Sequence, residues 1–129
     1  MQSAADKLSL ARRHLDRVQA AWDVPTNWDD LSLYGFYCLE NAVEAAAKHL
    51  GIRTSRNHWE KADLAGDLHK NHGLPDVEPL LRDLNEARKA RAYGDVEAPD
   101  LEAEEVAVLI EAYVEAVEEL LGIESDDDE

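Results

Sequence analysis

One continuous stretch of the sequence decides the fold: WDDLSLYGFYCLENAVEAAAKHL, residues 28–50. Its apolar residues recur at spacings of three and four over a wide arc, which is typical of a helix buried on most sides. Thr26 or Asn27 can cap its start. Glu44 and Lys48 are four residues apart, so we expect them to pair on its outer side. The sequence thus predicts a central helix that is the most buried of the chain.

Four further segments carry the apolar spacing of amphipathic helices, and none shows the alternation of a strand. Proline and glycine punctuate them, since Pro is tolerated in a first helical turn and Gly favours a helix end. The fold class is therefore expected to be all-α, a five-helix bundle that forms one domain over residues 1–123. A short acidic tail, 124–129, should be disordered. The other helices are expected from about 8 to 22, from 57 to 73, from 75–79 to 94 and from 99–100 to 121.

The composition of the 129-residue chain excludes several classes of protein. The net charge of −16 argues against general binding of duplex DNA, because neutralising phosphates requires spare cations. The sequence has no apolar run long enough for a membrane span and no signal peptide. We therefore expect a soluble, cytoplasmic protein without a membrane partner.

Cysteine and histidine give no sign of a metal or redox site. Cys38 is the single cysteine, so no internal disulfide can form, and we expect it to be a small buried apolar side chain. His69 and His72 could share a helix face, but no third ligand lies at a spacing typical of zinc. We therefore expect no metal and no cofactor.

A dense basic run, NEARKARAYGD at residues 85–95, stands out in this acidic chain. It contains Arg88, Lys89, Arg91 and Tyr93, whereas the sequence that follows it contains 14 acids and no Lys or Arg. A planar guanidinium fork suits a phosphate, and a tyrosine can stack or hydrogen-bond beside it. These four residues are therefore the candidate ligand-binding residues, for an anion such as a phosphate.

The same arginines have a structural alternative. Leu81, Leu84, Arg88 and Arg91 follow one another at spacings of three, four and three, so the arginines continue an apolar stripe. Their stems could pack on the core while their heads reach acids, for example on the glutamate-rich fifth helix. The sequence leaves both alternatives open.

Several segments are similar to those of one known family. Residues 34–51, YGFYCLENAVEAAAKHLG, match its central helix, and its next helix often begins near a His, as His58 does here. A Leu-x-x-x-Arg-x-x-x-x-Tyr segment before a final amphipathic helix matches residues 84–93 and 101–121. On these segments the chain resembles the HEPN domain, a small helical family found with minimal nucleotidyltransferases and in bacterial toxin–antitoxin and defence systems. The resemblance implies a homodimer, a nucleotidyltransferase-like or antitoxin partner, and an RNA or nucleotide ligand.

Catalytic members of that family use Arg-x(4–6)-His, in which His carries the proton and Arg stabilises charge on the phosphate. The matching arginine is Arg88, but Tyr93 stands five residues after it. An ordinary Tyr titrates near about 10, which makes it a poor base at neutral pH. Arg53 and His58 have the required spacing, although earlier in the chain than the family places its motif. The catalytic candidates are thus Arg88, Tyr93 and His58, for a metal-independent endoribonuclease.

Three functions stand as alternatives. The first is a HEPN-like RNA- or nucleotide-interacting module of a toxin–antitoxin or defence-type system, without the full catalytic motif. The second is an active HEPN endoribonuclease. The third is an acidic module that binds a basic protein or mimics nucleic acid through glutamates of the fifth helix, namely Glu104, Glu105, Glu111, Glu115, Glu118 and Glu119.

Overall fold

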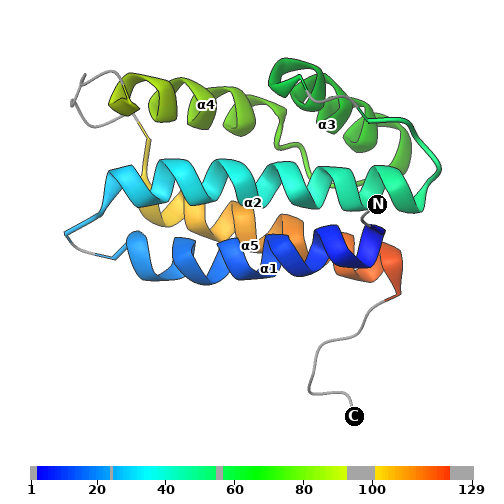
Figure 1. Ribbon diagram of the computed structural model, residues 1–129, viewed down its shortest axis with the longest axis horizontal. Helices are drawn as coiled ribbons and strands as arrows, with labels where there is room; N and C mark the ends of the chain where they lie inside the picture. The colour runs from blue at the N-terminus through cyan, green and yellow to red at the C-terminus, as the bar shows by residue number, and fades with distance from the viewer. Residues whose placement is uncertain (1–2, 24, 55–56, 93–100, 123–129) are drawn as a thin grey trace, which may run out of the picture.

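A computed structural model describes residues 3–23, 25–54, 57–92 and 101–122, apart from the side chains of Arg91 and Ala92. These residues form five α-helices and no strand, which confirms the all-α fold (Figure 1). No helix among them is both long and apolar enough to cross a membrane. The acidic tail predicted at 124–129 lies outside the described residues. The helices are α1 (Ala4–Ala21), α2 (Trp28–His49), α3 (His58–His72), α4 (Glu78–Ala92) and α5 (Ala103–Leu121).

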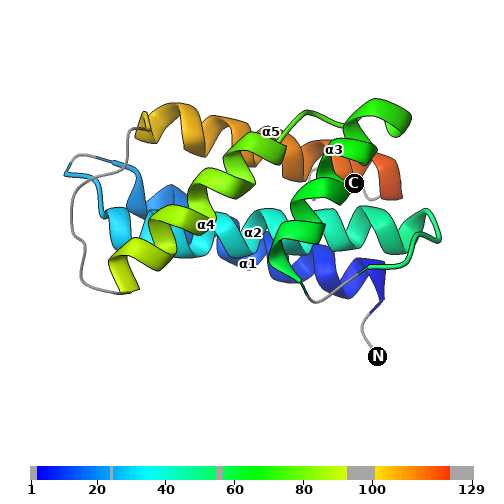
Figure 2. The same ribbon diagram turned by 90° about the horizontal axis from the view of Figure 1, so that it is seen from above.

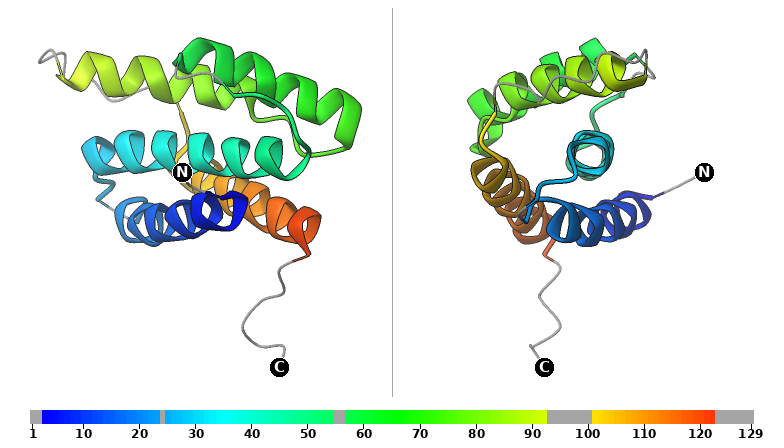
Figure 3. Two further views of the ribbon diagram at one scale, coloured as in Figure 1. Left: turned by 45° about the vertical axis from the view of Figure 1, so that its right-hand side comes forward. Right: turned by 90° about the vertical axis from the view of Figure 1, so that its left-hand side faces the viewer.

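The other helices are arranged around α2. In Figure 1, α2 lies between α4 above and α1 below, and the end-on view in Figure 3 shows α5 closing a further side. Seen from above, α3 and α4 cross over α2 (Figure 2). α2 contacts all four other helices and has more buried residues than any of them. The prediction that the second helix is the most buried is therefore confirmed.

A glycine on α2 allows two neighbouring helices to approach closely. A β-carbon added at Gly35 would lie 3.0 Å from Cδ1 of Ile110 on α5 and 3.4 Å from Cδ1 of Leu84 on α4. Protein interiors are packed too densely to accept such a group without movement of its neighbours. Gly35 therefore lets α4 and α5 approach α2 more closely than a residue with a β-carbon would allow without small side-chain shifts.

Polar side chains cap the starts of α1, α2 and α3. Asn27, and not Thr26, caps α2, because its side-chain oxygen accepts the backbone N–H of the third helical residue at 3.1 Å. Asn57 caps α3 in a similar way. Ser3 and Asp6 form a reciprocal capping box on α1, with both hydrogen bonds at 3.1 Å.

The fifth helix begins later than the sequence suggested. Its first residue is Ala103, because Glu102 is extended, with φ −93° and ψ 116°, and Leu101 is also outside the helix. The expected start at 99–100 lies outside the described residues, and the two residues after it, 101 and 102, are not helical. The side chain of Glu102 makes no capping hydrogen bond, so the turn before α5 does not follow the usual capping pattern.

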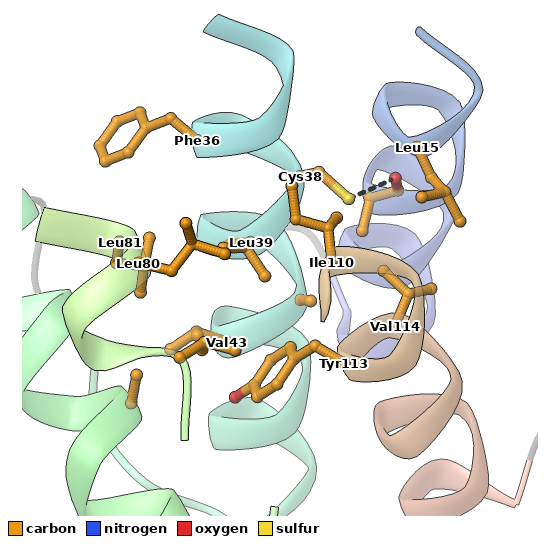
Figure 4. Close-up of a cluster of buried hydrophobic side chains, with 14 of the residues drawn as sticks. Leu15, Phe36, Cys38, Leu39, Val43, Leu80, Leu81, Ile110, Tyr113 and Val114 are labelled. Carbon is orange, nitrogen blue, oxygen red and sulfur yellow. Dashed lines mark hydrogen bonds between the residues drawn. The ribbon is translucent and has the colours of Figure 1, made fainter. Parts of the chain in front are cut away.

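The core is apolar and is formed around α2 (Figure 4). Cys38 lies within it and its thiol donates to the carbonyl oxygen of Ala11 at 3.2 Å. Burial raises the pKa of Cys38 to about 12, so the thiol stays protonated. This confirms its expected role as a buried apolar side chain. Tyr113 is also fully buried, and burial raises the pKa of its hydroxyl, which has no hydrogen-bond partner among the described residues.

Leu39→Ala should lower the free energy of unfolding by about 2–4 kcal/mol, because Leu39 is fully buried on α2 and its truncation leaves a cavity between several helices. The control is Val108→Ala on α5, where the side chain is 60% exposed and the loss should stay below about 0.5 kcal/mol. Urea unfolding of both variants measures the difference. Equal losses would contradict the central position of α2.

Candidate anion-binding site

Arg88 lies on aromatic rings of α2. Its guanidinium carbon is 4.8 Å from the ring centroid of Phe36 and 5.8 Å from that of Tyr37, distances at which a cation is attracted by the face of a ring. Figure 4 shows the Phe36 ring projecting from α2 on the side of α4. One guanidinium nitrogen, Nη2, donates to Oδ1 of Asn85 at 2.7 Å. The rings and the amide together fix the plane of the guanidinium.

Among the described residues, no acid neutralises the head of Arg88. Within the described residues no carboxylate lies at ion-pair distance from it, and its Nε atom is buried without a hydrogen-bond partner. The stem packs as the apolar stripe of the sequence predicts. The expected contact with acids of α5 is not found among these residues. An unneutralised cation and a buried unpaired N–H each carry a physical cost, and a bound anion would reduce the first.

His58 contacts the same phenylalanine. Its ring lies edge-on to that of Phe36 with 5.0 Å between centroids. Its Nδ1 is 2.5 Å from Oε2 of Glu40, a carboxylate on α2 that is only 5% exposed. A carboxylate on one ring nitrogen orients the imidazole and selects the tautomer in which the other nitrogen, Nε2, can accept a proton. Phe36 therefore joins Arg88 of α4 and His58 of α3 through one buried ring.

A cluster of buried charges supports this histidine. Nζ of Lys61 lies 2.5 Å from Glu44 and 3.7 Å from Glu40, and Nζ of Lys7 lies 2.9 Å from Glu44. Burial raises the pKa of Glu44, but hydrogen bonds and charges of Lys61 and Lys7 outweigh it, so the pKa is lowered overall. Glu44 therefore ties α2 to α1 and α3. The predicted pair with Lys48 is wrong, because lysines of the two flanking helices reach the carboxylate instead.

A groove of about 310 Å³ lies between the first turns of α3 and the middle of α4. Trp59 lines it and is 58% exposed, an unusual position for a large apolar side chain. Lys89 also lines it, is exposed, and has no carboxylate at ion-pair distance among the described residues. His58 and Asn85 complete the part of the wall next to Arg88. The groove thus offers a cation, an aromatic face and hydrogen-bonding groups together.

The groove is not uniformly positive. Arg82 lines it, but its guanidinium is already bound to Asp63 and Glu78 at 2.5 and 2.8 Å. Glu86 adds a negative charge to the wall. Attraction of an anion therefore depends on Lys89 and on the neighbouring Arg88.

The structure brings some of the sequence candidates together and leaves others apart. Arg88, Lys89 and His58 lie at or beside the groove, although Arg88 reaches it only through Asn85. The side chain of Arg91 and the whole of Tyr93 are outside the described residues. Arg53 is exposed in the segment after α2 and does not line the groove, so the Arg53–His58 spacing is not matched by a described contact.

Several residues of the candidate site were not found from the sequence. Phe36 and Glu40 were read only as part of the central helix, and Trp59 was not considered as a site residue. A weak signal existed for Glu40, which lies within an otherwise apolar arc of α2. A second basic group on α1, with Arg13 and Arg17 around His14, was also missed, although three basic residues in five positions are visible in the sequence.

The acids of α5 are not all free for a partner. Glu118 binds Arg12 of α1 at 2.9 Å, and Glu111 accepts a hydrogen bond from Gln19 at 3.1 Å. These two side chains link α5 to α1. The exposed acids of the helix are Glu104, Glu105, Glu115 and Glu119.

Within the described ranges, no group of three or more His, Cys, Asp or Glu side chains is placed to hold a metal ion.

The chain was compared with models of protein families, with curated proteins and with solved structures, and it matches none of them.

The Glu44 cluster makes folding stability depend on acidity. Because its folded pKa lies below the ordinary 4.5, the stability from Glu44 is complete above that value and is lost as pH falls through the lowered pKa. Between neutral and acid pH, the free energy of unfolding of Glu44→Gln should therefore fall less than that of the wild type. Urea unfolding at each pH measures it. The control is Glu115→Gln, at an exposed position of α5, which should follow the wild-type curve. Parallel curves for all three proteins would contradict this role of Glu44.

Proposed function

We propose that the chain is a nucleotide-binding module, of the HEPN-like type, that holds a nucleotide, free or within RNA, at the groove between α3 and α4. The observation that carries the proposal is the guanidinium of Arg88. It is fixed on Phe36 and bound to Asn85, yet has no acid partner among the described residues. The cation lies beside a groove that holds Lys89 and the exposed Trp59.

The cations support recognition of a phosphate. A guanidinium held in one plane can give two parallel hydrogen bonds to a phosphate, and less entropy is lost when its geometry is already fixed. Arg88 is held in this way by two rings and an amide. Lys89 follows it on α4 and adds a mobile point charge on the groove wall. The pair suits a phosphate better than a neutral ligand.

The aromatic side chain supports recognition of a base. Bases stack on aromatic side chains with little dependence on sequence. Trp59 is 58% exposed on the groove wall, so a large apolar face is available there. Asn85 and His58 lie on the same wall and can bond to a sugar or a base edge. A nucleotide combines the phosphate and the aromatic face that these residues match.

The net charge limits the ligand to a local contact. At −16 the chain repels a long polyanion, and duplex binding needs many cations. The homodimer and the nucleotidyltransferase-like or antitoxin partner belong to this proposal through the family resemblance alone.

Glu40, His58 and Arg88 favour a second function, a metal-independent endoribonuclease. A buried carboxylate orients His58, which could take a proton from a ribose hydroxyl, while Arg88 could stabilise charge on the phosphate. Arg88 and His58 both contact the ring of Phe36, at 4.8 Å and 5.0 Å from its centroid. The two side chains therefore lie close to one another. On this alternative His58, and not Tyr93, is the base.

Binding of AMP, measured by titration calorimetry, tests the first function. Arg88→Ala should weaken binding about tenfold or more, because a hydrogen-bonded charge is lost. Arg88→Lys should weaken it less, since the point charge remains but the fork does not. Lys89→Ala should also weaken it, and its exposed position makes a folding defect unexpected. The matched control is Lys70→Ala, at an exposed position far along α3, which should bind like the wild type.

Thermal melts of the same proteins separate binding from folding. A wild type that binds no AMP at millimolar concentration, together with a destabilised Arg88→Ala protein, would show that Arg88 has only a structural role.

Cleavage of a single-stranded RNA in EDTA tests the second function. His58→Ala should abolish the cleavage, whereas Arg53→Ala should leave it unchanged, because Arg53 does not line the groove. If the wild-type protein leaves the RNA intact, the endoribonuclease alternative fails. The proposal of nucleotide binding is not affected by that result.

A further inference from the structure

A second arginine of the chain is also held on a ring and not on an acid. The guanidinium carbon of Arg17, on α1, is 5.1 Å from the ring centroid of Tyr34 on α2. Arg17 is exposed, and no described carboxylate lies at ion-pair distance from it. Other cations of this acidic chain do find acids, as Lys7, Arg12 and Arg82 do. Among the described residues, Arg17 is thus positioned by a ring and keeps its charge.

A continuous series of ring contacts joins the two arginines. His14 of α1 stacks on Tyr34 with 5.8 Å between centroids and lies 6.1 Å from Tyr37. Tyr37 in turn lies 5.8 Å from the guanidinium carbon of Arg88. Tyr34, Tyr37 and His14 are all partly exposed. We call the surface formed by Arg17, His14, Tyr34, Tyr37 and Arg88 the α1–α2 strip.

The helix ends place this strip at one end of the bundle. The C-terminal end of α1, the N-terminal end of α2 and the C-terminal end of α4 lie one above another in Figure 1. Tyr34 and Tyr37 are about one helical turn apart on α2. Arg17 and Arg88 are therefore only a few helical turns apart and do not lie at opposite ends of the molecule.

Two arginines of α1 place positive charge beside His14 in this strip. Burial first, and then the charges of Arg17 and Arg13, lower the pKa of His14. Arg13 is exposed on the same helix and has no described acid partner. A guanidinium that lies over a ring keeps its N–H donors in its own plane, so Arg17 and Arg88 can each accept an anion at their edges.

We propose that the α1–α2 strip carries a second phosphate subsite at Arg17, so that the ligand is a single-stranded oligonucleotide and not a mononucleotide. This inference rests on the nucleotide site proposed at Arg88 and Lys89. One phosphate binds beside Arg88, and the strand crosses Tyr37 and His14 to place a later phosphate at Arg17. Aromatic side chains between two cations are typical of proteins that bind single strands. A duplex does not fit, because the chain offers few cations to its second strand.

The test compares binding of AMP and of an RNA octanucleotide by the full chain, using calorimetry and fluorescence anisotropy. The octanucleotide should bind at least about tenfold more tightly than AMP. Arg17→Ala should remove about that factor for the octanucleotide and leave AMP binding unchanged. Arg17→Lys should restore only part of it. Arg53→Ala removes the same charge at an exposed position beyond the other end of α2, and should bind both ligands like the wild type.

Several results would overturn the inference. If AMP binds and the octanucleotide binds no more tightly, or if Arg17→Ala leaves octanucleotide binding unchanged, the second subsite is absent while the first stands. If neither ligand binds, both proposals fail. If a poly-glutamate peptide binds in an Arg17-dependent manner and the octanucleotide does not, the strip recognises an acidic protein segment instead. Tyr34→Leu removes the ring under Arg17 and should reproduce the Arg17→Ala result.

Discussion

The burial of α2 by four other helices is the constraint on which the rest of the structure depends. It explains the run of alanines in the second half of α2 and the glycine where α4 and α5 approach. It also determines where α2 can carry polar side chains. Charged residues and partly exposed rings fit only at the edges of its contacts with the other helices. Glu40 and Glu44 lie at the border with α3 and α1, and Tyr34 and Tyr37 lie on the partly exposed strip beside α1. The helix that organises the core thus also positions the candidate site.

Two groups of cations among the described residues have different physical roles. Lysines and arginines that meet carboxylates join helices, as Lys61 joins α3 to α2 and Arg12 joins α1 to α5. Arg17 and Arg88 lie over aromatic rings instead. An aromatic ring holds a guanidinium in place but has no net charge, so the guanidinium stays positive. A carboxylate neutralises it instead. In a chain with 29 acids and 13 Lys and Arg residues, the two ring-held arginines therefore keep a positive charge that an outside anion can meet.

Much of the fold could be predicted from the sequence, because helical periodicity depends on residues close together in the chain. The wide apolar arc of α2 predicted its central position, and the spacing of Leu81, Leu84 and Arg88 predicted that the arginine stem would pack inward. The partner of Arg88 could not be predicted, since the choice between Phe36 and an acid of α5 depends on which helix faces α4. The Glu44–Lys48 pair was predicted from local spacing and failed because α1 and α3 supply closer lysines. Contacts between helices decided both of these points.

The central claim is that a nucleotide binds between α3 and α4, against Trp59 and beside Arg88. Titration of isotope-labelled protein with AMP, followed by NMR, locates the ligand directly. The account predicts that the indole N–H of Trp59 and the backbone amides from Asn85 to Lys89 shift on titration, while amides on the exposed face of α5 near Glu115 do not. Shifts confined to α5, or none at millimolar AMP, would contradict it.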